Sequence, residues 1–93
     1  MIVGILQAEL FISESSSLKE KRMIIKSFKE RVINKFNVSV AEIDYQDKWQ
    51  RALIAFATVS NKKSHTEEIL QKIFQLLDNE FRFELINYKF EYR

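Results

Sequence analysis

The stretch IVGILQAELFISESSSLKEK, residues 2–21, changes its hydrophobic period midway and so predicts a strand followed by a helix. From Ile2 to Ile12 apolar side chains recur at every second position, which is typical of a strand with one face in a core. Ser17 and Glu20 then match a capping box, in which the serine hydroxyl accepts a backbone N–H and the glutamate reaches back. A helix is therefore expected to begin at residue 18.

Working outward, the same criteria predict a complete βαββαβ order. The expected strands are 2–12, 38–45, 51–60 and 82–92, and the expected helices are 18–36 and 62–78. Right-handed crossovers of the two split βαβ units favour one α+β domain over residues 1–93. It would be a ferredoxin-like sandwich, with a four-stranded antiparallel sheet, two helices on one face, and the first and third strands in the centre.

Individual residues refine this prediction. Gly4, the only glycine, indicates that a helix or another backbone approaches the first strand closely. Asn37 is expected to close the first helix in a left-handed conformation, and Asn61 to cap the second. In the last strand, one face is expected to carry Ile86 together with Tyr88, Phe90 and Tyr92.

The composition excludes several kinds of chemistry. Because there is no cysteine, disulfides, thiolate nucleophiles and cysteine-based metal sites are ruled out. No run of about 18 apolar residues and no secretory signal is visible, so we expect a cytoplasmic protein without a membrane partner. His65 is the only histidine and lies beside Ser64 on one helical turn, where neighbouring side chains diverge. We therefore expect no catalytic residues, no metal site and no cofactor, and we predict that the protein is not an enzyme.

Charge is unevenly distributed along the chain. The net charge is only +2, yet residues 18–36 hold seven Lys/Arg against two Glu. On the predicted helix, spacings of three, four and three align Lys19, Arg22, Lys26 and Lys29 in one stripe, flanked by Lys21, Arg31 and Lys35. This basic stripe is a candidate for phosphate contacts. A solvated helix face is the alternative.

The sheet face away from the helices is expected to be apolar. The residues predicted to form an interface there are Val3, Ile5, Phe11, Leu53 and Val59. Such a patch favours self-association or partner binding, although long polar side chains could instead shield it. Base stacking as on RNA-recognition sheets is disfavoured, because the third strand lacks aromatic residues on this face.

The loop DYQDKWQR, residues 44–51, contains the only tryptophan. We expect a structural loop in which Trp49 folds over a helix end as a plug and Asp47 caps the turn. Gln50 or Arg51 would then hold backbone carbonyls. An exposed Trp49 acting as a binding hot spot is the alternative.

Four motifs in order resemble the YlxP-like bacterial family, a small domain of unknown function: SLKEKR at 17–22, FNVSVAE at 36–42, DKWQRA at 47–52, and VSN at 59–61 followed by His65. The resemblance implies a bacterial cytosolic protein with a ferredoxin-like fold. The family's genes commonly lie near those of translation initiation and ribosome maturation, which implies RNA or the ribosome as a partner. The family brings no established catalytic residues.

Two functions are therefore expected as alternatives. One is a non-enzymatic RNA- or ribosome-associated module that uses the basic stripe. The other is a homo-oligomeric interaction domain that pairs through the open sheet face. A small-molecule regulatory domain is a third possibility, but no loop chemistry in the sequence supports it.

Overall fold

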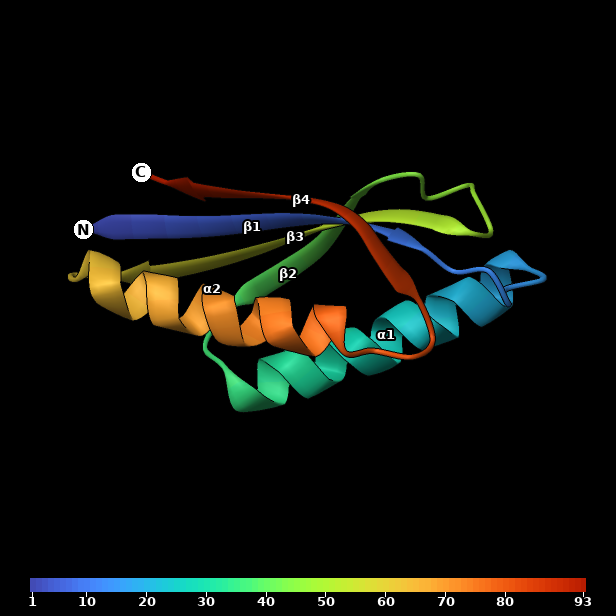
Figure 1. Cartoon of the computed structure of the whole chain (residues 1–93), viewed down its shortest axis with the longest axis horizontal. Coiled ribbons are helices and arrows are strands. Elements are labelled where there is room, and N and C mark those ends of the chain that lie inside the picture. Colours follow the sequence, from blue (N-terminus) through green and yellow to red (C-terminus); the bar gives the residue numbers. More distant parts are fainter.

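The computed structural model describes all residues 1–93. Its elements are β1 (Ile2–Phe11), α1 (Leu18–Lys35), β2 (Ser39–Asp44), β3 (Arg51–Ser60), α2 (Lys63–Asp78) and β4 (Glu84–Tyr92). The strands form one antiparallel sheet in the order β2-β3-β1-β4, and both helices lie on the same side of it (Figure 1). This is the predicted α+β, ferredoxin-like architecture, with β1 and β3 in the centre.

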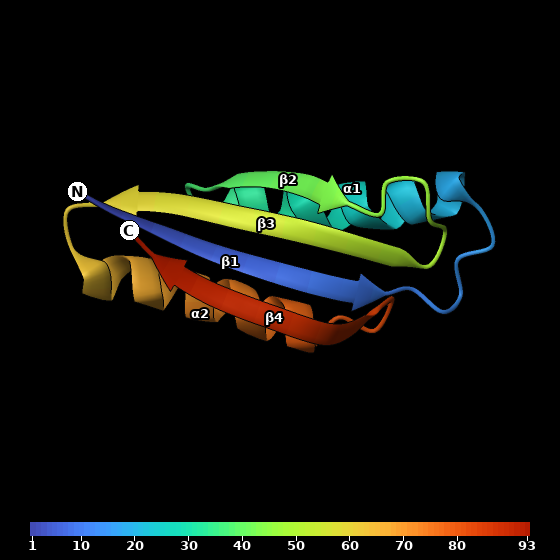
Figure 2. The same ribbon diagram turned by 90° about the horizontal axis from the view of Figure 1, so that it is seen from above.

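The second face of the sheet has no element across it. Figure 2 looks onto this open face, with α1 behind β2 and β3 and α2 behind β1 and β4. In the register of β1 and β3, Val3 pairs with Val59, Ile5 with Ala57, and Phe11 with Arg51. The open face therefore runs from an aliphatic end to an end that carries an aromatic ring and a guanidinium.

The core lies between the sheet and the helices. Phe28 of α1 packs edge-on against Phe56 of β3 and Phe83, with ring centroids 6.4 and 5.2 Å apart. Each apolar side chain buried in this way contributes about 1.5–3 kcal/mol relative to exposure. The larger aliphatic side chains that are fully buried are Leu6, Leu10, Ile12, Val32, Leu70, Ile73 and Leu77.

Gly4 lies where α2 approaches β1, as predicted. A Cβ at Gly4 would stand 3.0 Å from Thr66 Cβ and 3.1 Å from Leu70 Cδ1. Thr66 is itself fully buried, and its hydroxyl donates to the Lys63 carbonyl at 2.7 Å. The absent side chain lets this helix sit directly on the central strand.

The two helices begin differently. Ser17 Oγ accepts from the Glu20 N–H at 3.1 Å, but the Glu20 carboxylate bonds Ser16 rather than Ser17. The expected Asn61 cap of α2 is wrong. Lys62 is the N-cap residue and makes no side-chain cap bond. The N-cap thus lies one residue after the predicted asparagine, and the Ser60 hydroxyl accepts from the Lys62 N–H at 3.1 Å.

Two other local predictions are wrong. Asn37 does not adopt a left-handed conformation, because the chain leaves α1 in an extended conformation at Phe36 and runs straight toward β2. In β4, a bulge lies between the partners of Glu9 and Leu10. Leu85 therefore packs against the core, whereas Ile86 is exposed.

Candidate functional site

The basic stripe consists of Lys19, Arg22, Lys26 and Lys29, and all four side chains are exposed on α1. None of them has a carboxylate within 4.0 Å, whereas ion pairs form elsewhere on the surface, as between Lys72 and Glu68. The structure therefore keeps these four cations together and without counter-ions from the chain itself.

The flanking cations behave differently from the stripe. Lys21 is fully buried. Arg31 lies over the Phe28 ring and 3.7 Å from the buried Glu80 carboxylate, to which Arg82 also bonds. Two of the three cations expected beside the stripe are thus committed to internal contacts, because they face the sheet or the chain before β4.

Lys21 ties α1 to the end of β2. Its ammonium donates to the Tyr45 carbonyl at 2.5 Å and lies 2.8 Å from Glu42 Oε2. That oxygen is buried and makes no aligned hydrogen bond, so the neighbouring ammonium is what compensates its charge. A buried charge without such a partner would be strongly unfavourable.

Tyr45 begins the loop between β2 and β3 in a strained conformation. Its φ of 64° is the only positive value in the chain, in a region that costs a non-glycine residue about 1–2 kcal/mol. The carbonyl of Tyr45 accepts from both Lys21 Nζ and the Lys48 N–H, and its N–H donates to Asp44 Oδ1 at 2.7 Å. Asp44, rather than the expected Asp47, thus makes the side-chain hydrogen bond to the backbone at the start of this turn.

The far end of the same loop is fastened to the chain before α1. Gln50 Nε2 donates to the carbonyls of Ser13 at 2.9 Å and Ser15 at 3.4 Å. Of the two residues considered for this role, Gln50 makes the backbone contact, whereas Arg51 turns to the open face. Arg51 Nε lies 2.9 Å from Glu9 Oε2, and its guanidinium carbon lies 5.2 Å from the centre of the Tyr45 ring.

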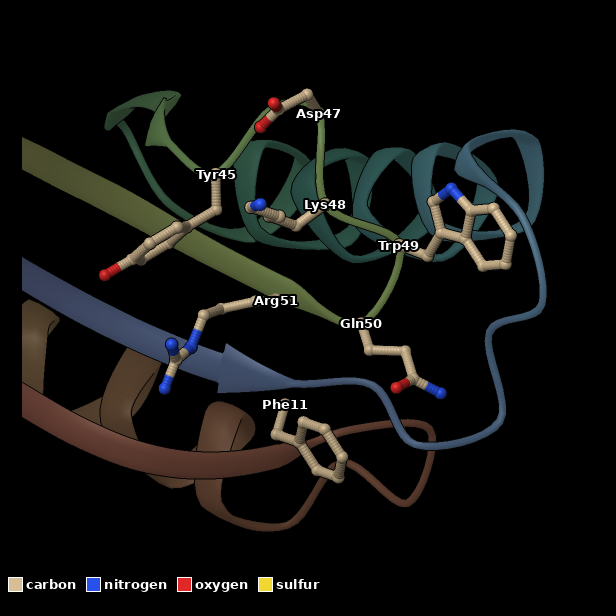
Figure 3. Close-up of a pocket in the computed structure, with 7 residues that line it drawn as sticks. All are labelled: Phe11, Tyr45, Asp47, Lys48, Trp49, Gln50 and Arg51. Atoms are coloured by element: carbon tan, nitrogen blue, oxygen red, sulfur yellow. The ribbon is translucent and has the colours of Figure 1, made fainter.

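Between these anchors lies a pocket of about 530 Å³ (Figure 3). Its lining residues come from the end of β1, from the loop and from the start of β3: Phe11, Tyr45, Asp47, Lys48, Trp49, Gln50 and Arg51. Trp49 is 55% exposed, so its interpretation as a plug over a helix end is wrong. Gln50, which secures the loop instead, leaves the indole free at the pocket rim.

The residues predicted to form an interface all lie on the open face. Val59 is 60% and Phe11 37% exposed, while Val3, Ile5 and Leu53 are half-buried by their neighbours. A hollow of about 220 Å³ lies on this face, and its lining includes Leu53 together with polar residues, among them Gln7, Glu9 and Lys89.

The remaining polar residues form no cluster of three His, Cys, Asp or Glu side chains able to hold a metal ion. His65 is exposed near the start of α2. Neither helix is both long enough and apolar enough to cross a bilayer.

Sequence reasoning missed the pocket as a unit. The sequence predicts Phe11 on the open face, Trp49 in the loop and Arg51 as a possible donor to backbone carbonyls. It does not predict that the three line one pocket, as they do in the structure. The left-handed conformation of Tyr45 could not be predicted, because a tyrosine at positive φ is rare and no sequence pattern indicates it. The pairing of Phe11 with Arg51 across β1 and β3 is visible only in the structure.

Comparison with known proteins agrees with the resemblance seen in the motifs. The family described as "Protein of unknown function (DUF503)" matches residues 3–90. The uncharacterized protein YlxP of Bacillus subtilis (strain 168) is 44% identical over 78 residues, which cover 84% of this chain and 85% of that protein. The chain therefore belongs to the YlxP-like DUF503 family of proteins of unknown function.

Proposed function

We propose that this protein is a cytoplasmic, non-enzymatic module that associates with RNA or the ribosome through the basic stripe of α1. The observation that carries the proposal is that four exposed cations share one stripe of a helix and none has an acidic partner. A solvated helix face usually mixes charges and pairs them, as α2 does with Lys72 and Glu68.

The geometry of the stripe suits a phosphate backbone. Lys19 and Lys29 are ten residues apart, so they span about 15 Å along the helix axis. The helix is held rigidly by its buried side chains and by the contacts of Lys21. Because the helix is already ordered, binding a polyanion would restrict only the four side chains and not the backbone that carries them.

Co-sedimentation with ribosomes or RNA at increasing salt tests this proposal. With four phosphate contacts to a single strand, log K should fall with log salt at a slope near −3. The variant Arg22→Glu, Lys26→Glu, Lys29→Glu should abolish binding. The matched control Lys62→Glu, Lys63→Glu, Lys72→Glu, whose residues lie at or on α2 and are exposed, changes the net charge equally and should bind far better. Undiminished binding by the folded stripe variant would refute the proposal.

A second candidate function is pairing of two copies through the open face. Val59 is 60% exposed beside Val3 in the register, and no element covers this end of the sheet. Light scattering of the wild type and of Leu53→Lys would test it. A wild-type dimer that dissociates in the Leu53→Lys variant supports pairing through the sheet. A wild-type protein that is monomeric at high micromolar concentration refutes it.

A further inference from the structure

We infer that the pocket between Phe11 and the loop Tyr45–Arg51 binds one unstacked nucleotide of single-stranded RNA. This inference rests on the proposed function. It adds that the RNA is single-stranded and that one of its bases enters this pocket. Its lining joins three aromatic rings, Phe11, Tyr45 and Trp49, to two cations, Lys48 and Arg51.

The aromatic rings are presented as stacking surfaces. Trp49 and Phe11 keep 55% and 37% of their surface exposed, although burial would be favourable for both. In Figure 3, Gln50 lies between them, and Lys48 and Arg51 lie toward Tyr45. The volume of about 530 Å³ falls within the range of about 300–1,000 Å³ that small-ligand pockets occupy.

The pairing of rings with cations identifies the chemistry. Single-stranded RNA is recognised by stacking its splayed bases on aromatic side chains and on arginine planes, while basic groups meet its phosphates. Among the lining residues, Asp47 supplies the only carboxylate against the cations of Lys48 and Arg51. Arg51 is already paired with Glu9, whereas the Lys48 ammonium has no carboxylate within 4.0 Å. An apolar peptide side chain would use the rings but leave Lys48 without an anionic partner.

The pocket is held open before any ligand arrives. The ammonium of Lys21 and the backbone N–H of Lys48 donate to the carbonyl of the strained Tyr45. At the opposite end of the loop, the Gln50 side chain donates to the carbonyls of Ser13 and Ser15. Glu9 orients Arg51 against the Tyr45 ring. Backbone strain that the surroundings maintain is typical of ligand sites, because it positions side chains in advance.

The same anchors connect the pocket to the basic stripe. Lys21, which holds Tyr45, is flanked in the sequence by Glu20 and Arg22, and the segment that Gln50 grips leads directly into α1. A strand whose phosphates contact Lys19 and Arg22 would lie at the end of α1 to which this loop is anchored, and we infer that one of its bases enters the pocket. A duplex, whose bases stay stacked and paired, would contact the stripe alone.

The single tryptophan supplies the assay. A mixed-sequence single-stranded RNA 12-mer should quench Trp49 fluorescence, because a base stacks on the indole. Inorganic polyphosphate, which has charge but no bases, should bind without this quenching. The variant Trp49→Ala, followed by anisotropy of labelled RNA, should weaken single-strand binding at least about fivefold, the lower end of what one stacked base contributes, and leave polyphosphate binding and the salt slope unchanged.

Phe81→Ala is the matched control, since Phe81 is 92% exposed and lies outside the pocket. It should leave RNA binding unaltered. If single-stranded RNA and polyphosphate bind alike and Trp49→Ala changes neither, the pocket assignment is refuted while the stripe stands. If neither polyanion binds, the proposed function fails and the pocket assignment fails with it.

Discussion

The two helices cover the same face of the sheet but are held there in different ways. α2 rests on the central strand by close packing, with Thr66 and Leu70 against Gly4. α1 adds a charged anchor to its apolar contacts, since buried Lys21 reaches Glu42 and the Tyr45 carbonyl. The helix that carries the exposed cations is thus also the helix whose position depends on a lysine. Loss of the Lys21 anchor in α1 should therefore affect stability and the candidate site together, whereas a change where α2 packs on Gly4 should affect stability alone.

The largest effect on stability is expected for Lys21→Ala, which removes the charged anchor of α1. It leaves the Glu42 carboxylate without its cation and the strained Tyr45 carbonyl with one donor fewer. We expect a loss of about 2–4 kcal/mol in the free energy of unfolding, somewhat below the ~3–5 kcal/mol of fully buried pairs, because the Glu42 side chain is 20% exposed. Urea unfolding measures it. Lys26→Ala on the exposed side is the control and should cost under about 0.5 kcal/mol; equal losses would contradict the anchor.

The corresponding test of α2 is Gly4→Ala. The added Cβ would meet Thr66 Cβ at 3.0 Å, so the helix must shift away from β1. We expect a destabilisation of about 1–3 kcal/mol, typical of overpacked cores, measured by thermal or urea unfolding. An uncrowded glycine in a strand would instead gain about 0.5–1 kcal/mol on this change. A stabilised variant would therefore argue against the close contact.

Helix starts give a smaller pair of effects with opposite signs. Ser17→Ala removes the cap of α1 and should cost about 1 kcal/mol. Lys62→Asp places a carboxylate at the uncapped start of α2, where the backbone is already extended, and should stabilise by about 0.5–1 kcal/mol. Both changes are read from unfolding midpoints. Two changes of the same sign would mean that the helix starts are not as different as their hydrogen bonds indicate.

The smallest expected effect is a pH dependence at the start of α1. The hydroxyl and the backbone N–H of Ser16 hold the pKa of Glu20 below its ordinary value of 4.5. A lowered pKa means that the contribution is present above pH 4.5 and is lost as pH falls through the folded-state value. Wild-type stability should therefore decline more than that of Glu20→Gln below pH 4.5. If the free energy of unfolding of the two proteins falls equally below pH 4.5, Glu20 does not contribute to this pH dependence.

Much of this protein was determined by its sequence alone. The period-two runs, the Ser17 cap and the single glycine predicted the order of elements, the central strands and the place where a helix touches β1. These features are local, or depend on spacing within one element, so a linear pattern carries them. The basic stripe belongs to this class, because a helical period places its four members together.

Only the tertiary structure decided which cations stay free and how the loop is held. Lys21 is buried while Arg22 beside it is exposed, because α1 turns one toward Glu42 and the other toward solvent. The bulge that exposes Ile86 and the left-handed Tyr45 likewise arise from contacts between elements distant in the chain. The pocket has the same origin: Phe11 and Arg51 become neighbours only when β1 and β3 pair, and no spacing within either strand specifies that register.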